Sequence, residues 1–340
     1  MANESKMVHY EEAAKHFTEA IRMRPGFAMP YIYRGEVYHK MGKFDLAITD
    51  YTQAIFWTRQ PARAYYGRGM AHGAKGDIDK AIEDFTKTIQ HEPEYAEAYY
   101  HRGHAYVDKN EFDLAIEDCD KAIQLNPDLA DAYVVRDNAY SGKDEFDFAI
   151  MDYSKAIRLN PDDVYVYRKL GDLHFLKGDF DTSIENYNTA IKLEMNDAHN
   201  YHFRGFAYFL KGEFDLAFAD YAKALELKSD YVQVYYTRAR TWLYQKKWTK
   251  VREDLTIAKD KGLNISILFC KGYDSVADFE RQNDVKLPED IAAMLTGQER
   301  TVIPPVQENQ YQPPCRIELS LFRDIIAMVP EEEHALQFTM

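Results

Sequence analysis

Two pairs of histidines are the side chains in this sequence best placed to do chemistry. His101 lies three residues before His104, and His199 lies three residues before His202. On a helix this spacing brings two imidazoles side by side, an arrangement that can hold a metal ion. Neither pair has an evident third or fourth ligand. We therefore expect no metal and no cofactor, and we expect the histidines to line a polar groove.

No catalytic motif accompanies the histidines. The sequence has no glycine-rich loop that could cradle a phosphate, and no serine or cysteine nucleophile with a partnered base. The three cysteines are far apart and odd in number, which fits a reducing compartment better than a disulfide framework. We expect no enzymatic activity and no catalytic residue in this chain.

The composition is that of a folded protein with no affinity for nucleic acid or membranes. The 340 residues are 46% hydrophobic and 29% charged, which predicts a well-buried core. The net charge is −14 and no block of Lys and Arg stands out, so nucleic acid is not an expected partner. No apolar run approaches the roughly 20 residues that span a bilayer. The N-terminus also lacks the apolar core of a secretory signal, and we expect a cytoplasmic location.

A period of 34 residues organises most of the chain. One column of the aligned sequence holds tyrosine throughout, at Tyr31, Tyr65, Tyr99, Tyr133, Tyr167, Tyr201 and Tyr235. Within one repeat, apolar and small residues follow the i, i+3, i+4, i+7 spacing of an amphipathic helix twice, with Gly42 between the two halves. Glycine ends a helix readily, and a proline such as Pro127 stops the second helix from continuing. The pattern predicts a helical hairpin repeated in tandem.

Arginine and aspartate form a second pair of columns, sixteen residues apart. The pairs are Arg34 with Asp50, Arg68 with Asp84, Arg102 with Asp118, Arg136 with Asp152, Arg204 with Asp220, and Arg238 with Asp254. The one complete repeat without the arginine has Leu170, and its partner position holds Asn186. Because the two residues occur together and are lost together, we infer an interhelical Arg–Asp contact, partly buried and bidentate. Ordinary surface charge with coincidental spacing is the alternative.

These features resemble the tetratricopeptide repeat family. The residues that match its pattern are Gly35, Tyr38, Ala47, Tyr51, Ala54 and Pro127. The usual tryptophan and leucine of the first helix are Tyr31 and Arg34 here, a variant similar to bacterial members. The resemblance implies an all-α, right-handed superhelical solenoid of antiparallel helix pairs, about seven and a half repeats long.

The array predicts the following division of the chain. Residues 8–27 form a half repeat with the second helix only, and seven repeats follow at 28–61, 62–95, 96–129, 130–163, 164–197, 198–231 and 232–264. A C-terminal helical extension follows, with capping helices at 265–297, a Pro/Gln linker at 298–315 and an amphipathic tail at 316–340. The half repeat leaves an apolar face, with Tyr10 and Phe17, that another surface could cover.

In this family one face of the first helices lines the concave surface, where ligands bind. The candidate partner-binding residues on that face are Tyr165, Arg168, Lys169, Phe175, His199, His202, Phe203, Phe206, Phe209, Tyr236 and Arg240. Two interpretations are open. Either neighbouring first helices bury these side chains against one another, or they form an apolar groove with a basic edge. We favour the groove, because Phe203, Phe206 and Phe209 offer more apolar surface than stacking should require.

The expected function is that of an interaction scaffold for a protein or peptide. A self-assembling structural protein, joined through the half repeat or the tail, is an alternative, and so is a regulatory subunit of an enzyme on another chain. The tail could also compete with the partner, because Phe322 and Ile325 would suit an aromatic groove and the glutamates of 331–333 would suit its cations.

Overall fold

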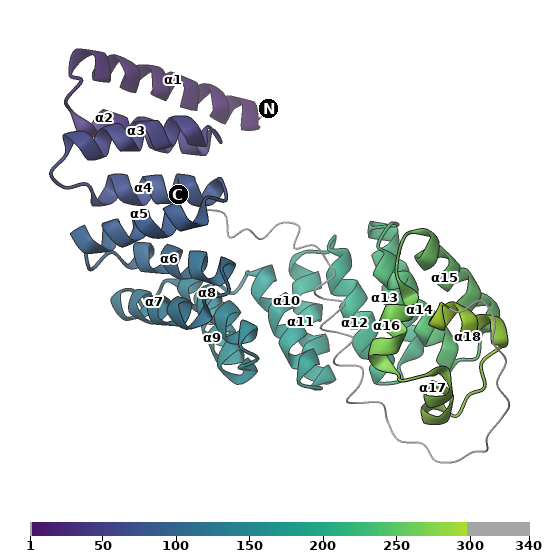
Figure 1. Ribbon diagram of the computed structural model, residues 1–340. Coiled ribbons are helices and arrows are strands. Elements are labelled where there is room, and N and C mark those ends of the chain that lie inside the picture. The colour runs from purple at the N-terminus through teal and green to yellow at the C-terminus, as the bar shows by residue number, and fades with distance from the viewer. Residues whose placement is uncertain (1, 298–340) are drawn as a thin grey trace. The chain divides into compact units, whose positions relative to one another are not determined.

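The computed structural model describes residues 2–297, and all regular secondary structure in that range is α-helical (Figure 1). The described residues form two compact units, which divide between Pro161 and Asp162. The expected linker 298–315 and tail 316–340, with the hypothesis that the tail competes for the groove, lie outside the described residues.

Unit 1 is a series of helical hairpins preceded by one long helix. Its helices are α1 (Ala2–Met23), α2 (Ala28–Lys40), α3 (Phe44–Trp57), α4 (Ala62–Ala74), α5 (Ile78–His91), α6 (Ala96–Asp108), α7 (Phe112–Leu125), α8 (Ala130–Gly142) and α9 (Phe146–Leu159). Within each hairpin the helices pack in the order of the chain, α2 on α3, α4 on α5, α6 on α7 and α8 on α9.

Unit 2 continues with three hairpins and a group of short helices. Its hairpin helices are α10 (Val164–Leu176), α11 (Phe180–Leu193), α12 (Ala198–Leu210), α13 (Phe214–Leu227), α14 (Val232–Tyr244) and α15 (Trp248–Asp260). The short helices are α16 (Ile265–Gly272), α17 (Val276–Asn283) and α18 (Glu289–Thr296). They extend the core of this unit, because Phe269, Phe279 and Ile291 are buried in one apolar cluster with the last hairpins.

The turn inside each hairpin needs one residue in the left-handed conformation. Gly42 has φ +69° with open space around it, and the amide of Lys43 donates to the carbonyl of Tyr38 at 2.8 Å, which ends the first helix. Asn110 and Asp144 take the same conformation, at φ 58° and 62°. Both residue types tolerate this region better than other non-glycine residues.

Small residues allow the two helices of a hairpin to approach closely. Ala47 and Ala54 are fully buried, and so is Tyr51 between them. A Cβ atom added at Gly35 would lie 2.9 Å from the Tyr51 ring, which is closer than side chains normally come. The glycine and alanine columns of the sequence therefore mark the seam of the hairpin, and the large ring fills the space beside it.

Helix α1 packs on the first complete hairpin without a preceding partner of its own. Ala14 is buried, and the half-buried ring of Phe17 stacks on Tyr33 at 5.6 Å. Met7 and Val8 are exposed, at 43% and 60%. The helix therefore covers α2 with Ala14 and Phe17, whereas Met7 and Val8, nearer its N-terminal end, remain in solvent.

Candidate interaction face

Each Arg–Asp pair of the sequence forms a two-point ion pair across its hairpin. The arginine Nε and Nη2 donate to the two carboxylate oxygens at 2.6–2.8 Å in the pairs that begin at Arg34, Arg68, Arg102, Arg136, Arg204 and Arg238. The arginine comes from the first helix and the aspartate from the second. The geometry matches the planar fork of a guanidinium to a carboxylate. We call each of these arrangements a clamp.

The surroundings of each clamp favour a charged arginine. The hydrogen bond to Asp50 raises the pKa of Arg34, and the ring of Tyr38 lies 5.7 Å from the guanidinium, where its negative face attracts a cation. Burial raises the pKa of the Asp118 carboxyl, and the hydrogen bonds from Arg102 oppose that shift. The clamp is therefore partly buried, and each charged side chain needs its partner to offset the free-energy cost of leaving water.

The remaining nitrogen of the arginine reaches the preceding hairpin, a contact that the sequence columns did not predict. Nη1 of Arg34, Arg68 and Arg102 donates to Thr18, Thr52 and Thr86 at 2.8, 3.1 and 3.0 Å. Nη1 of Arg204 donates to Asn188 at 2.7 Å, and that of Arg136 donates to Asp120. The signal was present in the sequence, because each acceptor stands sixteen residues before its arginine. The clamp thus joins three helices.

The repeat without a clamp has replaced both members of the pair compatibly. Leu170 is buried and Asn186 donates its amide to the backbone carbonyl of Thr182 at 2.8 Å. The same hairpin has a buried hydrogen bond of another kind, from the Tyr187 hydroxyl to Asp172 at 2.5 Å. No charge is left in this repeat at the position of the clamp.

The aromatic groove expected in unit 2 is closed, so that expectation was wrong. The residues of that prediction that prove to be buried are Phe175, His202, Phe203, Phe206, Phe209, Tyr236 and Arg240. The rings of successive first helices pack on one another: Phe206 lies 5.4 Å from Phe175 in a tilted arrangement, and Phe209 meets Tyr244 edge to face at 5.0 Å. The Arg240 guanidinium lies over Phe206 at 5.6 Å. The stacking interpretation is therefore right for these side chains, and the groove interpretation is wrong for them.

One histidine of each pair, His101 and His202, takes a structural position. His202 lies 3.3 Å from the Tyr231 hydroxyl and 3.0 Å from that of Thr237, and burial lowers its pKa well below the ordinary value. Burial also lowers the pKa of His101 to about 3, and its ring stacks on Phe85 at 5.7 Å. Both rings are therefore neutral core groups. Within residues 2–297 no three His, Cys, Asp or Glu side chains gather as a metal site.

The other predicted contact residues remain partly accessible and lie together on α10 and α12, which are neighbours in unit 2 (Figure 1). Arg168 and Lys169 each place a cationic group 5.4 Å from the ring of Tyr165. Arg168 also lies 3.6 Å from Asp197, and His199 Nε2 lies 3.8 Å from Asp172. We call Tyr165, Arg168, Lys169 and His199 the cationic site.

Two acidic side chains, Asp172 and Asp197, lie beside the basic side chains of the cationic site. Burial alone would raise the pKa of Asp172, but the neighbouring His199 and Lys169 and the hydrogen bond from the Tyr187 hydroxyl outweigh it, and the pKa is lowered. The Asp172 carboxylate is thus held ionised beneath the cations. The site combines a partly exposed ring with two basic side chains, which suits an acidic or aromatic ligand group.

Models of the tetratricopeptide repeat match residues 6–64, 62–95, 96–129, 138–178, 171–212 and 198–231. This chain belongs to the tetratricopeptide repeat family. Tetratricopeptide arrays are modules of protein interaction, and this chain is an interaction scaffold of that type. No curated protein sequence matches it.

Two solved structures support the same fold. One is the C-terminal part of a TPR repeat-containing protein from Cytophaga hutchinsonii, 18% identical, covering 65% of this chain and 91% of its own, with a TM-score of 0.53. Another is in the APC/C hetero-tetramer Cut9–Hcn1, 17% identical, covering 68% and 46%, with a TM-score of 0.56. MamA is 32% identical over 47% of this chain and 94% of its own, with a TM-score of 0.46.

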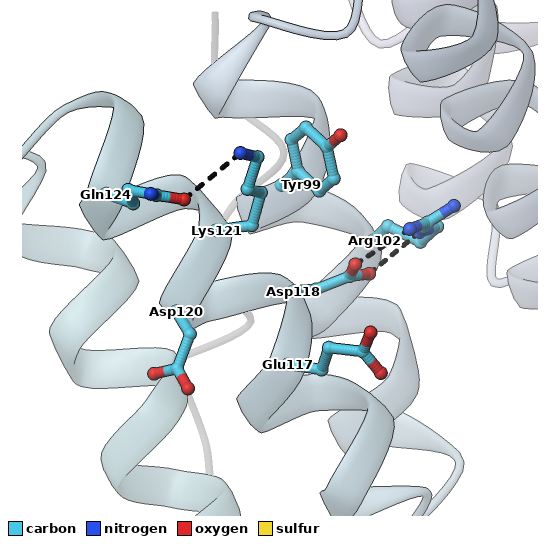
Figure 2. A pocket seen from close by; sticks show the side chains of 7 residues that line it. All are labelled: Tyr99, Arg102, Glu117, Asp118, Asp120, Lys121 and Gln124. Carbon is cyan, nitrogen blue, oxygen red and sulfur yellow. Dashed lines mark hydrogen bonds and ion pairs between the residues drawn. The ribbon is translucent and has the colours of Figure 1, made fainter.

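One clamp, Arg102 with Asp118, also lines a pocket on the surface of unit 1. Figure 2 shows Arg102 and Asp118 joined by their two hydrogen bonds at its wall, with Tyr99, Glu117 and Lys121 around them. Because the polar groups of the clamp already bond to each other, this pocket is the outer surface of a structural contact. Among the helices of residues 2–297, none is both long and apolar enough to cross a membrane.

Proposed function

We propose that this tetratricopeptide protein binds a peptide or protein segment at the cationic site on α10 and α12, without catalysis of its own. The observation that carries the proposal is the pair of cations, Arg168 and Lys169, beside the partly exposed ring of Tyr165. An acidic partner segment would compete with Asp197 and Asp172 for these basic side chains.

The closed aromatic stack beneath the site supports this assignment. Phe203 and Phe206 are completely buried, so they hold α10, α12 and α14 in fixed positions. A site on a rigid scaffold loses less conformational entropy on binding. In this account the phenylalanines of the first helices position the site, and the polar side chains above them contact the ligand.

The test is affinity capture from an extract of the source organism, quantified by mass spectrometry. We expect proteins that are retained by the natural chain to be lost with the variant Arg168→Glu/Lys169→Glu. The control variant Lys192→Glu/Lys259→Glu changes two exposed lysines on the second helices of the same unit, and it should retain them. Equal capture by all three chains would contradict a partner site here.

Self-assembly is a second candidate function, supported by the apolar side chains that α1 leaves in solvent, Met7 at 43% and Val8 at 60%. It predicts a mass, measured by light scattering, that grows with concentration and falls back in the variant Met7→Gln/Val8→Gln. A constant monomer mass would leave only the scaffold, either alone or as a regulatory subunit, and co-purification with an enzyme would distinguish these two.

A further inference from the structure

A second surface, in unit 1, exposes several large apolar side chains together. Met23 and Phe27 are 76% and 52% exposed, and Phe56 and Trp57 are 74% and 45% exposed. Arg24 and Arg59, in the same two turns, are exposed as well. Burying a large apolar side chain is favourable, so an exposed cluster of them is unusual for a surface without a partner. We call these six residues the aromatic–arginine edge.

The two turns that carry the edge touch each other. The position of a Cβ atom on Gly26, in the turn between α1 and α2, is 3.6 Å from the Trp57 ring at the end of α3. The rings of Phe56 and Trp57 meet edge to face at 4.7 Å. Figure 1 shows both turns on the same side of unit 1. The edge is therefore one continuous surface.

Hairpin packing does not require Phe56. Later repeats of unit 1 have Gln90 and Gln124 at the position of Phe56, as expected for a solvated site. Their turns also carry acids, such as Glu94 and Asp128, whereas the first two turns carry Arg24 and Arg59. In the sequence no Asp or Glu occurs in residues 20–35 or 51–76. The edge thus differs from the other turns in both charge and apolar surface.

The composition of the edge is that of the energetic centre of a protein interface. Such centres are enriched in Trp, Phe, Met and Arg and depleted in Lys, Glu and Asp. We propose that the aromatic–arginine edge is a docking site for an acidic segment of a second protein that carries leucine, isoleucine or phenylalanine side chains. The apolar side chains would cover Phe56 and Met23, and the carboxylates would pair with Arg24 and Arg59. The proposal does not depend on the cationic site of unit 2.

The experiment selects from a library of random 16-residue peptides displayed on phage. The full chain is the target, and clones that bind the support without the protein are removed. The test variant is Met23→Gln/Phe56→Gln, which changes the two most exposed apolar residues of the edge and should keep the fold. We expect the surviving peptides to be rich in Asp and Glu and to contain Leu, Ile or Phe.

Binding of a synthesised clone is then measured by fluorescence anisotropy. We expect a loss of affinity of about tenfold or more with Met23→Gln/Phe56→Gln, and a similar loss with Arg24→Glu/Arg59→Glu. Two controls should bind normally: Phe148→Gln/Met151→Gln, which changes other exposed apolar side chains of unit 1 (53% and 66%), and Arg168→Glu/Lys169→Glu, which alters the cationic site.

Three results would overturn the proposal. The first is a set of clones that are not acidic or that are unaffected by either edge variant. The second is flotation of the natural chain, but not of the edge variants, with phosphatidylglycerol vesicles, which would assign the edge to a membrane surface. The third is a concentration-dependent increase in mass that the edge variants abolish, which would assign it to a second copy of this chain. Loss of peptide binding only with the Arg168→Glu/Lys169→Glu variant would support the proposed function and refute this inference.

Discussion

Replacing Arg102 by leucine tests the clamp most strictly, because Leu170 is the natural example of that change. The variant leaves the Asp118 carboxylate, whose side chain is 7% exposed, without the two hydrogen bonds of 2.7 Å that satisfy it. A unit charge pair at about 4 Å is worth about 4 kcal/mol at an effective dielectric constant near 20. Removing one partner of a buried pair costs about 3–5 kcal/mol in measured cases. We expect a loss of that size in the free energy of unfolding.

The double variant Arg102→Leu/Asp118→Asn should recover most of that loss, since it reproduces the combination of Leu170 and Asn186. The assay is a double-mutant cycle from urea unfolding curves followed by circular dichroism. We expect a coupling energy of about 2–4 kcal/mol between the two positions. A coupling energy near zero, with Arg102→Leu no more destabilising than a surface substitution, would refute our explanation of the joint loss. That explanation is that losing either Arg or Asp leaves its partner as an unpaired buried charge.

Three further outcomes follow from buried groups. Because burial lowers the pKa of His101 to about 3, only the unfolded chain takes up that proton between pH 7.5 and 5. Stability is therefore lost as the pH falls through 6.5, by about 2 kcal/mol for this residue, and the natural chain should lose that much more than His101→Phe in urea titrations at the two pH values. Gly67→Ala should cost about 1–3 kcal/mol, because its Cβ would lie 2.5 Å from the buried Tyr51 ring, whereas Gly26→Ala, with 3.6 Å of space, should stay within about 0.5 kcal/mol by thermal unfolding. Phe206→Ala should cost about 3–5 kcal/mol in the same measurement, since the ring is completely buried; an unchanged unfolding temperature would contradict its place in the core.

The fold could be predicted because its determinants repeat along the chain. One hairpin contains all the contacts that define it, so Gly35, Ala47 and Tyr51 recur every 34 residues and can be aligned within a single sequence. The Arg–Asp pair was visible for the same reason, and the joint loss of both residues at Leu170 and Asn186 indicated that they are in contact. Contacts within one repeat can therefore be predicted, because the residues that make them recur with the period of the repeat.

The burial of the first-helix face could not be predicted in this way. Whether Phe203 and Phe206 are exposed depends on the distance between neighbouring first helices, which is set by how successive hairpins stack and not by any residue spacing. The link from Arg102 to Thr86 was missed for a related reason. Its acceptor stands sixteen residues before the arginine, but the contact joins one repeat to the preceding one, and the pairing was sought only within a repeat. The aromatic–arginine edge could not be predicted from the repeat either, because Phe56 differs from the residues at the equivalent position of later repeats.

Site-specific photo-crosslinking from position 165 tests the interaction face most directly. Tyr165 is replaced by benzoyl-phenylalanine in the full chain, which is expressed in the source organism and irradiated, and the products are identified by mass spectrometry. The account predicts a discrete crosslinked partner from position 165 and none from a control at Leu216, which is 48% exposed on α13. Crosslinks that form only from position 216, or only between copies of this chain, would contradict it.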